Sequence, residues 1–289
     1  METAHTLTTP DGVQLTYRRW HAPNHSQLPP LVLLHGAASN MTRWSEFVEQ
    51  TILKQSRDLV RLDLRGHGQS LFRGRLGLEI WADDLVLILE REHIPRAIVG
   101  GHCLGANIAM LFAARHPQRT AGLVLVEPML RPALTGALHR LLPFTLLLQL
   151  AIAVIRGFTR LGIYRRQLEQ LDLRELDREF RRRLTEPGGG EALVKRYASP
   201  LHDLKIMPAA NFLQDLVEVT RPLPLDQLQT TFLALLSSGR TFADPDITRP
   251  LLVSLELGEI HTLDAKHWIP TEQPLPMRVD IEAWCANIR

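Results

Sequence analysis

The sequence predicts an α/β protein, in which a mostly parallel sheet is flanked by helices and carries an inserted helical cap. Three observations support this prediction. Short β-type runs alternate with helical patterns up to residue 128, strand signals disappear from 129 to 228, and they return between 229 and 289. Alternating strands and helices are typical of a parallel sheet covered on both faces. We therefore expect a core made of residues 1–128 and 229–289, with the cap at 129–228.

The elements expected before the cap are short apolar strands and two helices. The first helix, residues 80–92, has apolar residues at helical spacing, and the second, residues 104–116, is rich in small residues and stops at Pro117. Turn-forming glycine, asparagine or serine follows the early strands. The expected strands cover residues 16–20, 31–34, 59–64, 97–100 and 122–126.

Leucine-rich and arginine-rich helical patterns fill the cap. They are broken at Pro143, at residues 187–190 and around Pro222 and Pro224. The most apolar stretch, residues 141–155, is shorter than the roughly 20 residues that span a bilayer, so we do not expect a transmembrane helix. After the cap, we expect strands at 231–237 and 259–263 and an amphipathic helix at 277–288.

The composition excludes several function classes. Of the 289 residues, 45% are apolar and 22% are charged, as in an ordinary soluble globular protein. A formal net charge of +2 is too small to favour nucleic acid as a partner. The two cysteines, Cys103 and Cys285, form no CxxC pair, so we expect neither a disulfide framework nor a metal site. The N-terminus lacks the apolar run of a signal peptide, and we expect a cytoplasmic protein.

One short motif carries the chemistry. Gly101-His102-Cys103-Leu104-Gly105 stands between a predicted strand and a predicted helix, where a turn with glycines on both sides can present a nucleophile. The N-terminus of the following helix favours a thiolate or a developing oxyanion. We therefore expect Cys103 to be a nucleophile, and Cys285 to be structural.

With this motif and three others, the chain resembles the α/β-hydrolase superfamily. His35-Gly36-Ala37 matches the oxyanion loop of that family, residues 63–70 (DLRGHGQS) match its D-x-R-G-x-G-x-S turn, and residues 264–268 (DAKHW) match the loop that presents its catalytic histidine. The four matches follow the order of the family and cover nearly the whole chain outside the cap. The resemblance implies a mostly parallel sheet of the eight-stranded type, the α/β-hydrolase fold.

The resemblance also implies roles for individual residues. Cys103 is the nucleophile and His267 its general base, while the backbone N–H groups of Ala37 and Leu104 form the oxyanion hole. No metal and no organic cofactor is implied. Residues beside these motifs are expected to contact the substrate, namely His35, Gly36, Met41, Trp44, His102 and Trp268.

Two carboxylates compete for the third place in the catalytic triad. Asp244 follows the strand at 231–237, where the family often has its acid, but needs a slightly longer loop. Glu127 ends the strand at 122–126, where some branches of the family place the acid. Either could orient His267 and stabilise its charged form.

A cysteine where the family usually has serine changes the expected chemistry. The acyl-enzyme would be a thioester, which suits exchange with thioester donors and acyl transfer as well as hydrolysis. Dienelactone hydrolases and polyhydroxyalkanoate synthases are similar in this respect. We therefore expect a hydrolase or acyltransferase acting on an ester or thioester. The alternatives are a lactone hydrolase similar to dienelactone hydrolases and a non-catalytic ligand-binding module on the same fold.

The cap suggests the kind of substrate and partner. The apolar stretch at residues 138–155, with Met41, Trp44 and Phe112 expected nearby, predicts a hydrophobic acyl part. The segment between residues 156 and 183 contains nine arginines and five acidic residues. This segment could contact an anionic membrane surface, coenzyme A or an acyl carrier protein, or could be a solvated helix face.

Overall fold

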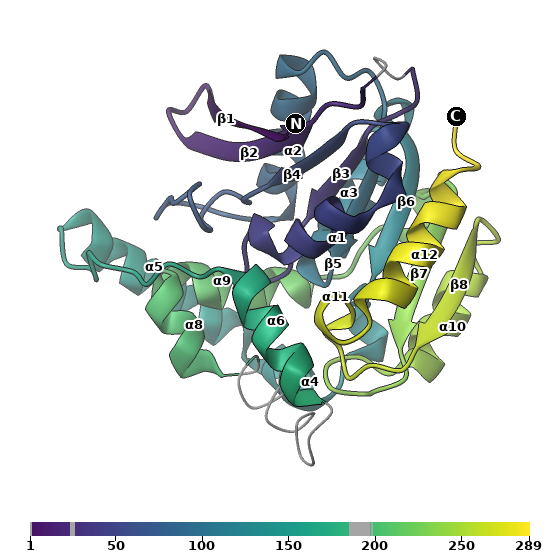
Figure 1. Ribbon diagram of the computed structural model, residues 1–289. Coiled ribbons are helices and arrows are strands. Elements are labelled where there is room, and N and C mark those ends of the chain that lie inside the picture. Colours follow the sequence, from purple (N-terminus) through teal and green to yellow (C-terminus); the bar gives the residue numbers. More distant parts are fainter. Residues whose placement is uncertain (1, 24–26, 185–196, 198) are drawn as a thin grey trace.

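The computed structural model describes residues 2–23, 27–184, 197 and 199–289. Its centre is a sheet of eight strands in the order β1-β2-β4-β3-β5-β6-β7-β8 (Figure 1). The strands from β4 onward in this order are parallel, and β1 and β2 pair antiparallel at one edge. The strands are β1 (Glu2–Thr8), β2 (Gln14–Trp20), β3 (Leu31–Leu34), β4 (Leu59–Leu62), β5 (Ala97–His102), β6 (Thr120–Val126), β7 (Phe232–Ser237) and β8 (Gly258–Leu263).

This sheet confirms the expected fold class, and the burial of the central strands explains why the sequence signal was strong. Strands β3, β5 and β7 are buried along their whole length because helices cover both faces of the sheet. Strand β1 was not expected. It is an edge strand with the sequence ETAHTLT, and its mostly exposed side chains leave little apolar periodicity to detect.

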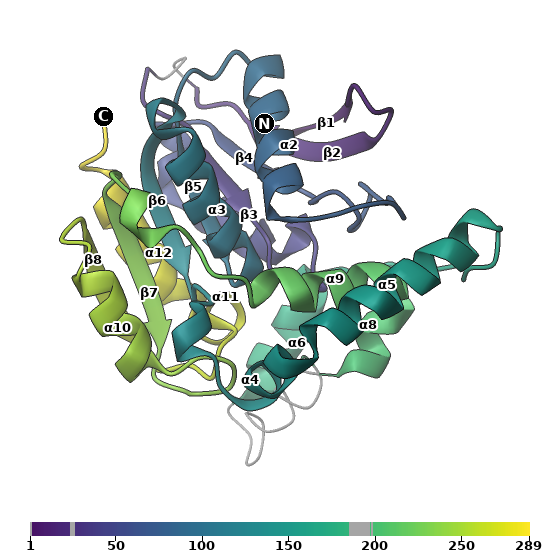
Figure 2. The same cartoon turned by 180° about the vertical axis from the view of Figure 1, so that it is seen from behind.

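Alternate residues of the strands enter two separate cores. Val32 and Leu34 face the core beneath α2 (Leu78–Arg91) and α3 (Leu104–Arg115). Leu31 and Leu33 face the core beneath α1 (Ser45–Gln50) and α12 (Pro274–Cys285). Two short helices beside β7 and β8, α10 (Pro245–Val253) and α11 (Ile269–Glu272), complete the layers (Figure 2). Single turns of 3-10 helix are η1 (Met41–Trp44), η2 (Ile52–Gln55), η3 (Pro117–Arg119), η4 (Arg131–Ala133), η5 (Leu142–Phe144) and η6 (Leu225–Gln227).

Among its described residues, the chain between β6 and β7 forms helices joined by loops and contains no strand. Its helices are α4 (Gly136–Leu141), α5 (Thr145–Arg160), α6 (Leu173–Leu184), α8 (Pro200–Ile206) and α9 (Ala209–Val219). They gather at one end of the sheet (Figures 1 and 2) and fall within the segment predicted as the cap. The expected break at Pro143 lies in η5, whereas the break expected at residues 187–190 lies outside the described residues.

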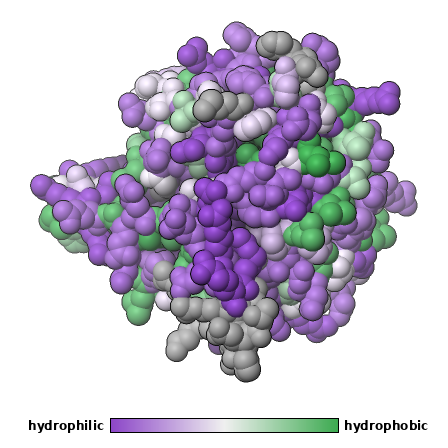
Figure 3. Space-filling model, in the orientation of Figure 1, coloured by the Kyte–Doolittle hydropathy of each residue, from purple (hydrophilic) through white to green (hydrophobic). Residues whose placement is uncertain are grey.

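Part of the arginine-rich segment forms a solvated helix face. The surface over α6 is strongly hydrophilic (Figure 3). Arg174 and Arg178 of this helix lie 2.6 and 3.6 Å from carboxylate oxygens of Glu49. For these two arginines, ion pairing at the surface accounts for the charge without any partner molecule.

The apolar segment differs from the expectation. The stretch expected to be too short for a membrane span lies in a longer helical run, Gly136–Arg160, which has 25 residues and contains an 18-residue window with a mean hydropathy of 1.9. By length and composition this run could cross a membrane, and only 6% of its most apolar window is buried. The run is not a single straight helix, because η5 with Pro143 separates α4 from α5.

Candidate active site

Cys103 lies in a strained turn between β5 and α3. Its φ of 54° is in the left-handed region, which side-chain-bearing residues seldom adopt. A Cβ on Gly101 would lie 2.1 Å from the carbonyl carbon of Gly105, and a Cβ on Gly105 would lie 2.5 Å from the carbonyl oxygen of Leu34. The two glycines of the motif are therefore required for α3 to pack this closely behind Cys103.

His267 and Glu127 meet beside this turn. Glu127 follows β6 and also has a positive φ, 53°. One of its carboxylate oxygens accepts the N–H of Ser237, at the end of the neighbouring strand β7. The other oxygen, Oε2, lies 3.0 Å from Nδ1 of His267. Because Nδ1 is occupied by Glu127, Nε2 is the nitrogen of His267 that remains for Cys103.

The environment of His267 favours its protonated form. Burial alone would lower its pKa, but hydrogen bonds with Cys103 and Glu127 outweigh burial and raise the pKa from 6.5 to about 9. The Phe242 ring packs edge-on against the imidazole with 4.9 Å between ring centroids. This packing and the bond to Glu127 together restrict the rotation of the imidazole.

Asp244, the other candidate acid, lies in a different environment. It caps the N-terminus of α10, where its side chain accepts the N–H of Asp246 at 2.9 Å, and it lies 3.4 Å from Arg240. Of the two carboxylates that the sequence left open, the structure brings Glu127 into contact with His267 and gives Asp244 a capping position.

The loop after β3 closely approaches the turn at Cys103. A Cβ on Gly36 would lie 3.3 Å from Cβ of Cys103. Ala37 follows in this loop, and Leu104 is the first residue of α3. In the described part of the chain, no hydrogen-bond acceptor occupies the N–H of Ala37 or of Leu104. Both N–H groups expected for an oxyanion hole thus lack an acceptor among the described residues, and Ala37 lines the cavity in front of Cys103.

His35, expected to contact the substrate, does not line the cavity in front of Cys103. It is fully buried, its Nδ1–H donates to the carbonyl oxygen of Gly36 at 2.8 Å, and its Nε2 accepts the N–H of Leu64 at 3.0 Å. Burial and the neighbouring His67 hold the pKa of His35 well below its usual range. His35 is therefore a neutral residue that fixes the backbone of the loop.

A buried ion pair that the sequence analysis missed also holds this loop. Asp215 of α9 accepts the N–H of Ala38 at 3.0 Å, and the same oxygen lies 2.8 Å from Nε2 of His67. Burial lowers the pKa of His67, but Asp215 more than compensates and raises it. Ala38 has a positive φ of 45°. Asp215 lies in a helix without a recognised motif, so no local signal marked it.

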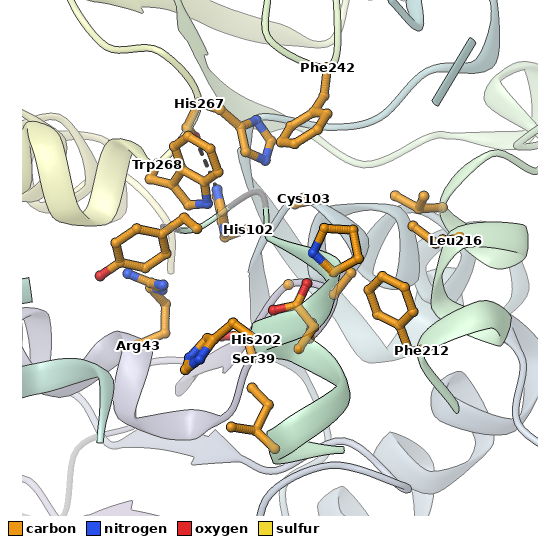
Figure 4. Close-up of a pocket in the computed structure, with 18 of the residues that line it drawn as sticks. Ser39, Arg43, His102, Cys103, His202, Phe212, Leu216, Phe242, His267 and Trp268 are labelled. Atoms are coloured by element: carbon orange, nitrogen blue, oxygen red, sulfur yellow. Dashed lines mark hydrogen bonds between the residues drawn. The ribbon is translucent and has the colours of Figure 1, made fainter. Parts of the chain in front are cut away.

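A cavity of about 350 Å³ opens in front of Cys103 (Figure 4). One wall is apolar and comes largely from the helices between β6 and β7, with Leu138, Leu141, Leu171, Leu173, Leu176, Ile206, Phe212, Leu216 and Val219. Gly36, Ala37, His102, His267 and Trp268 line the catalytic end. Nε2–H of His102 donates to the carbonyl oxygen of His267 at 3.2 Å.

Met41, Trp44 and Phe112, expected near the substrate, do not line this cavity. Trp44 and Phe112 are fully buried in the two cores, and the indole N–H of Trp44 donates to the carbonyl oxygen of Leu34 at 3.1 Å. The backbone N–H of Met41 donates to Asp63 at 2.7 Å, so this residue belongs to the structural turn. An apolar residue near a motif can pack inward as easily as toward a ligand, which explains these errors.

The polar wall of the cavity was also missed by the sequence analysis. Nη1 of Arg43 lies 2.8 Å from Oδ1 of Asp177 in α6 and 2.5 Å from the hydroxyl of Thr271. Tyr197 donates to the same carboxylate. These contacts join α6 to α11, the short helix that follows His267, so the helices over the cavity are connected to the segment that carries His267. Among the described residues, no group of three or more histidine, cysteine or acidic side chains is placed to hold a metal ion.

Comparisons with known proteins agree with this architecture. The sequence model of the alpha/beta hydrolase fold family matches residues 29–160. The sn-1-specific diacylglycerol lipase ABHD11 of Danio rerio is 29% identical over 131 residues, which are 45% of this chain and 40% of that protein. A probable alcohol acetyltransferase of Saccharomyces cerevisiae is 28% identical over 102 residues, which are 34% of this chain and 30% of that protein. The chain thus spans less than half the length of these relatives.

A solved structure matches over almost the whole chain. The enol-lactonase from Burkholderia xenovorans superposes with a TM-score of 0.70 and 16% sequence identity, covering 98% of this chain and 100% of that one. At this level of identity the likeness concerns the arrangement of strands and helices.

Proposed function

Because the chain has the α/β-hydrolase fold, we propose that it is an acyl-transfer enzyme, an esterase, thioesterase or acyltransferase with Cys103 as its nucleophile. The observation that carries the proposal is the hydrogen bond between Glu127 and His267, with His267 and Cys103 lining the same end of the cavity. A nucleophile, a base and a group that orients the base are the minimal set for covalent acyl transfer.

The geometry supports a two-step reaction. His267 takes the thiol proton on Nε2 while the sulfur of Cys103 attacks the substrate carbonyl carbon. The N–H groups of Ala37 and Leu104 stabilise the resulting oxyanion. The tetrahedral intermediate then collapses, the bond to the leaving oxygen or sulfur breaks, and His267 returns its proton to the leaving group. Water or another acceptor, deprotonated by His267, releases the acyl group from the thioester and restores the thiol.

The cavity supports a substrate with a hydrophobic acyl part. Its apolar wall is built from leucine, isoleucine and phenylalanine side chains, which suit an alkyl or aryl chain. That relatives of the chain are a lipase and a probable acetyltransferase supports acyl chemistry in both the hydrolytic and the transfer direction. A small and polar cavity would have favoured the lactone hydrolase, and the apolar wall argues for the longer acyl substrate instead.

Intact-mass spectrometry after mixing with acyl thioesters and activated esters of increasing chain length tests the proposal. We expect a mass increase equal to one acyl group, located on Cys103, which clears when water or an acceptor alcohol is given time to react. The Cys103→Ala variant should form no adduct. The matched Cys285→Ala variant should react like the unmodified protein, because Cys285 is fully buried in the core beneath α12.

Other outcomes would count against the proposal. Turnover by Cys103→Ala near the original rate would exclude the cysteine mechanism. If no donor forms an adduct and Cys103 also fails to react with small thiol reagents, the non-catalytic ligand-binding module becomes the better description of this chain.

A further inference from the structure

Helix α5 has two apolar faces, and only one of them is packed. The inner face presents Leu148, Ile152 and Ile155 to Ala210, Leu213 and Val217 of α9. Among the α5 residues only Ile152 is fully buried. The far end of the helix extends away from the sheet as an arm (Figures 1 and 2). One contact face is enough to hold the helix, so the second face needs another explanation.

The outer face of the arm is a continuous apolar row. Its members are Leu147, Leu150, Val154, Phe158 and Leu161, which are between 50% and 75% exposed. Their spacing of three or four residues places them on one side of the helix over about four turns. Single exposed apolar residues are common on protein surfaces, but a contiguous row of this kind marks an interaction site.

Positive charge is concentrated in the part of the chain that contains this row. No aspartate or glutamate occurs between Glu127 and Glu169, and six arginines do, at positions 131, 140, 156, 160, 165 and 166. The whole chain has a formal net charge of only +2, so positive charge is concentrated here. Over the described residues, no carboxylate forms an ion pair with any of the six, in contrast to Arg174 and Arg178 of α6. Glu218 interacts electrostatically with Arg156, whereas Arg160, Arg165 and Arg166 at the far end of α5 form no ion pair with a described carboxylate. The far end of the segment is therefore apolar and cationic.

We propose that the outer face of α5 docks on an anionic phospholipid surface. Burial of the leucine, valine and phenylalanine side chains in the boundary between headgroups and acyl chains would stabilise the contact, and the flanking arginines would bind lipid phosphates. Residues 137, 138 and 141 of α4 line the cavity in front of Cys103, and only the single turn η5 separates α4 from α5. Docking therefore brings the apolar wall of the cavity close to membrane lipids.

The helix lies on the membrane and does not cross it. Helix α5 has 16 residues, and at about 1.5 Å per residue it is about 24 Å long, less than the hydrocarbon core of roughly 30 Å. The preceding α4 cannot extend the span, because Leu138 is buried in the main core and Pro143 interrupts the run. The inner face of α5 also remains on α9, so only one side of the helix is available to lipid.

A second copy of the chain fits the row less well than lipid does. A helix about 24 Å long and about 10 Å wide offers roughly 240 Å² on one side. A stable protein interface buries about 800 Å² on each partner, and its core is depleted of charge. The unpaired arginines around the row would remain without counter-charges in such a pair. Lipid phosphates supply them.

Vesicle flotation with the full chain tests the proposal. We expect binding to vesicles of phosphatidylcholine with phosphatidylglycerol that is at least tenfold stronger than binding to phosphatidylcholine alone. The triple variant Leu150→Ser/Val154→Ser/Phe158→Ser and the triple variant Arg160→Gln/Arg165→Gln/Arg166→Gln should each reduce binding at least tenfold. The matched control Leu275→Ser/Val279→Ser removes two exposed apolar side chains of α12 and should leave binding unchanged.

The experiments can distinguish a failure of the docking proposal from a failure of the proposed catalysis. Cys103→Ala should float with vesicles like the unmodified protein, and both arm variants should retain the thermal melting temperature, because the changed side chains are exposed. No flotation with either lipid mixture, or flotation unaffected by the serine variant, would overturn the docking. A dimer that forms in analytical ultracentrifugation and dissociates in the serine variant would also overturn the docking. The same holds if the arginines bind a soluble acyl carrier protein while the chain does not bind vesicles.

Discussion

Oε2 of Glu127 lies 3.0 Å from Nδ1 of His267, although the two residues are 140 positions apart in the chain. Glu127 ends β6 and His267 follows β8, and strand β7 lies between these two strands in the sheet. The second oxygen of Glu127 is held by the N–H of Ser237 at the end of β7. The Glu127 side chain thus reaches past the end of β7 to contact the imidazole.

This contact predicts that Glu127→Gln lowers kcat/KM by on the order of 1000-fold, because the imidazole loses the charge that stabilises its protonated form and fixes its tautomer. Asp244→Asn should change kcat/KM by no more than about twofold, since Asp244 contacts Arg240 and Asp246 and not His267. The measurement is steady-state hydrolysis of an activated ester. Equal small losses in the two variants would show that neither carboxylate serves as the triad acid.

The two cysteines should differ sharply in reactivity. Cys103 lines the cavity, whereas burial raises the pKa of Cys285 to about 12. The thiolate is the reactive form, so iodoacetamide at neutral pH should modify Cys103 well before Cys285. Peptide mapping over time measures the two rates. Equal rates in the folded protein would contradict the assignment of Cys103 as nucleophile.

Stability should depend on pH through His267. Its pKa is raised from 6.5 to about 9 in the folded protein because hydrogen bonds with Cys103 and Glu127 outweigh its burial. The folded state therefore binds the proton more tightly, and this contribution is complete below pH 6.5 and is lost as the pH rises through about 9. Urea unfolding of the unmodified protein and of His267→Gln should show a difference in unfolding free energy that shrinks across this window. A difference that grows with pH would contradict the raised pKa.

Asp215→Asn should weaken both the fold and the turnover. The substitution removes the buried negative charge beside His67, which costs on the order of 3 kcal/mol of unfolding free energy. It also weakens the hydrogen bond from the N–H of Ala38, which holds the loop beside the expected oxyanion donor Ala37. We therefore expect kcat to fall about tenfold with KM nearly unchanged. Asn211→Ala is the control. It removes hydrogen bonds from the same helix to the carbonyl oxygens of Gly66 and Phe72, so it should lower stability with little effect on kcat.

The sequence alone was sufficient for the fold class and for the glycine-flanked turn at Cys103. Continuous apolar runs such as β3 and β7 predict buried parallel strands because both faces of such strands are covered. The glycines at positions 101 and 105 indicate a turn in which a Cβ would collide with the backbone. These are local properties, since backbone conformation and burial on both faces of a strand restrict the residue types within a few positions of the sequence.

The tertiary structure decided which carboxylate contacts His267 and placed Met41 and Trp44 away from the cavity. It also brought Asp215 to the loop of Ala38 and left the outer face of α5 exposed. Each of these depends on which elements become neighbours after folding. An apolar row on a helix has the same sequence pattern whether α9, a substrate or a membrane lies against it. A carboxylate at the end of a strand likewise has the same sequence pattern whether or not an imidazole lies within reach. Only the order of the strands and the packing of the helices supply the partner.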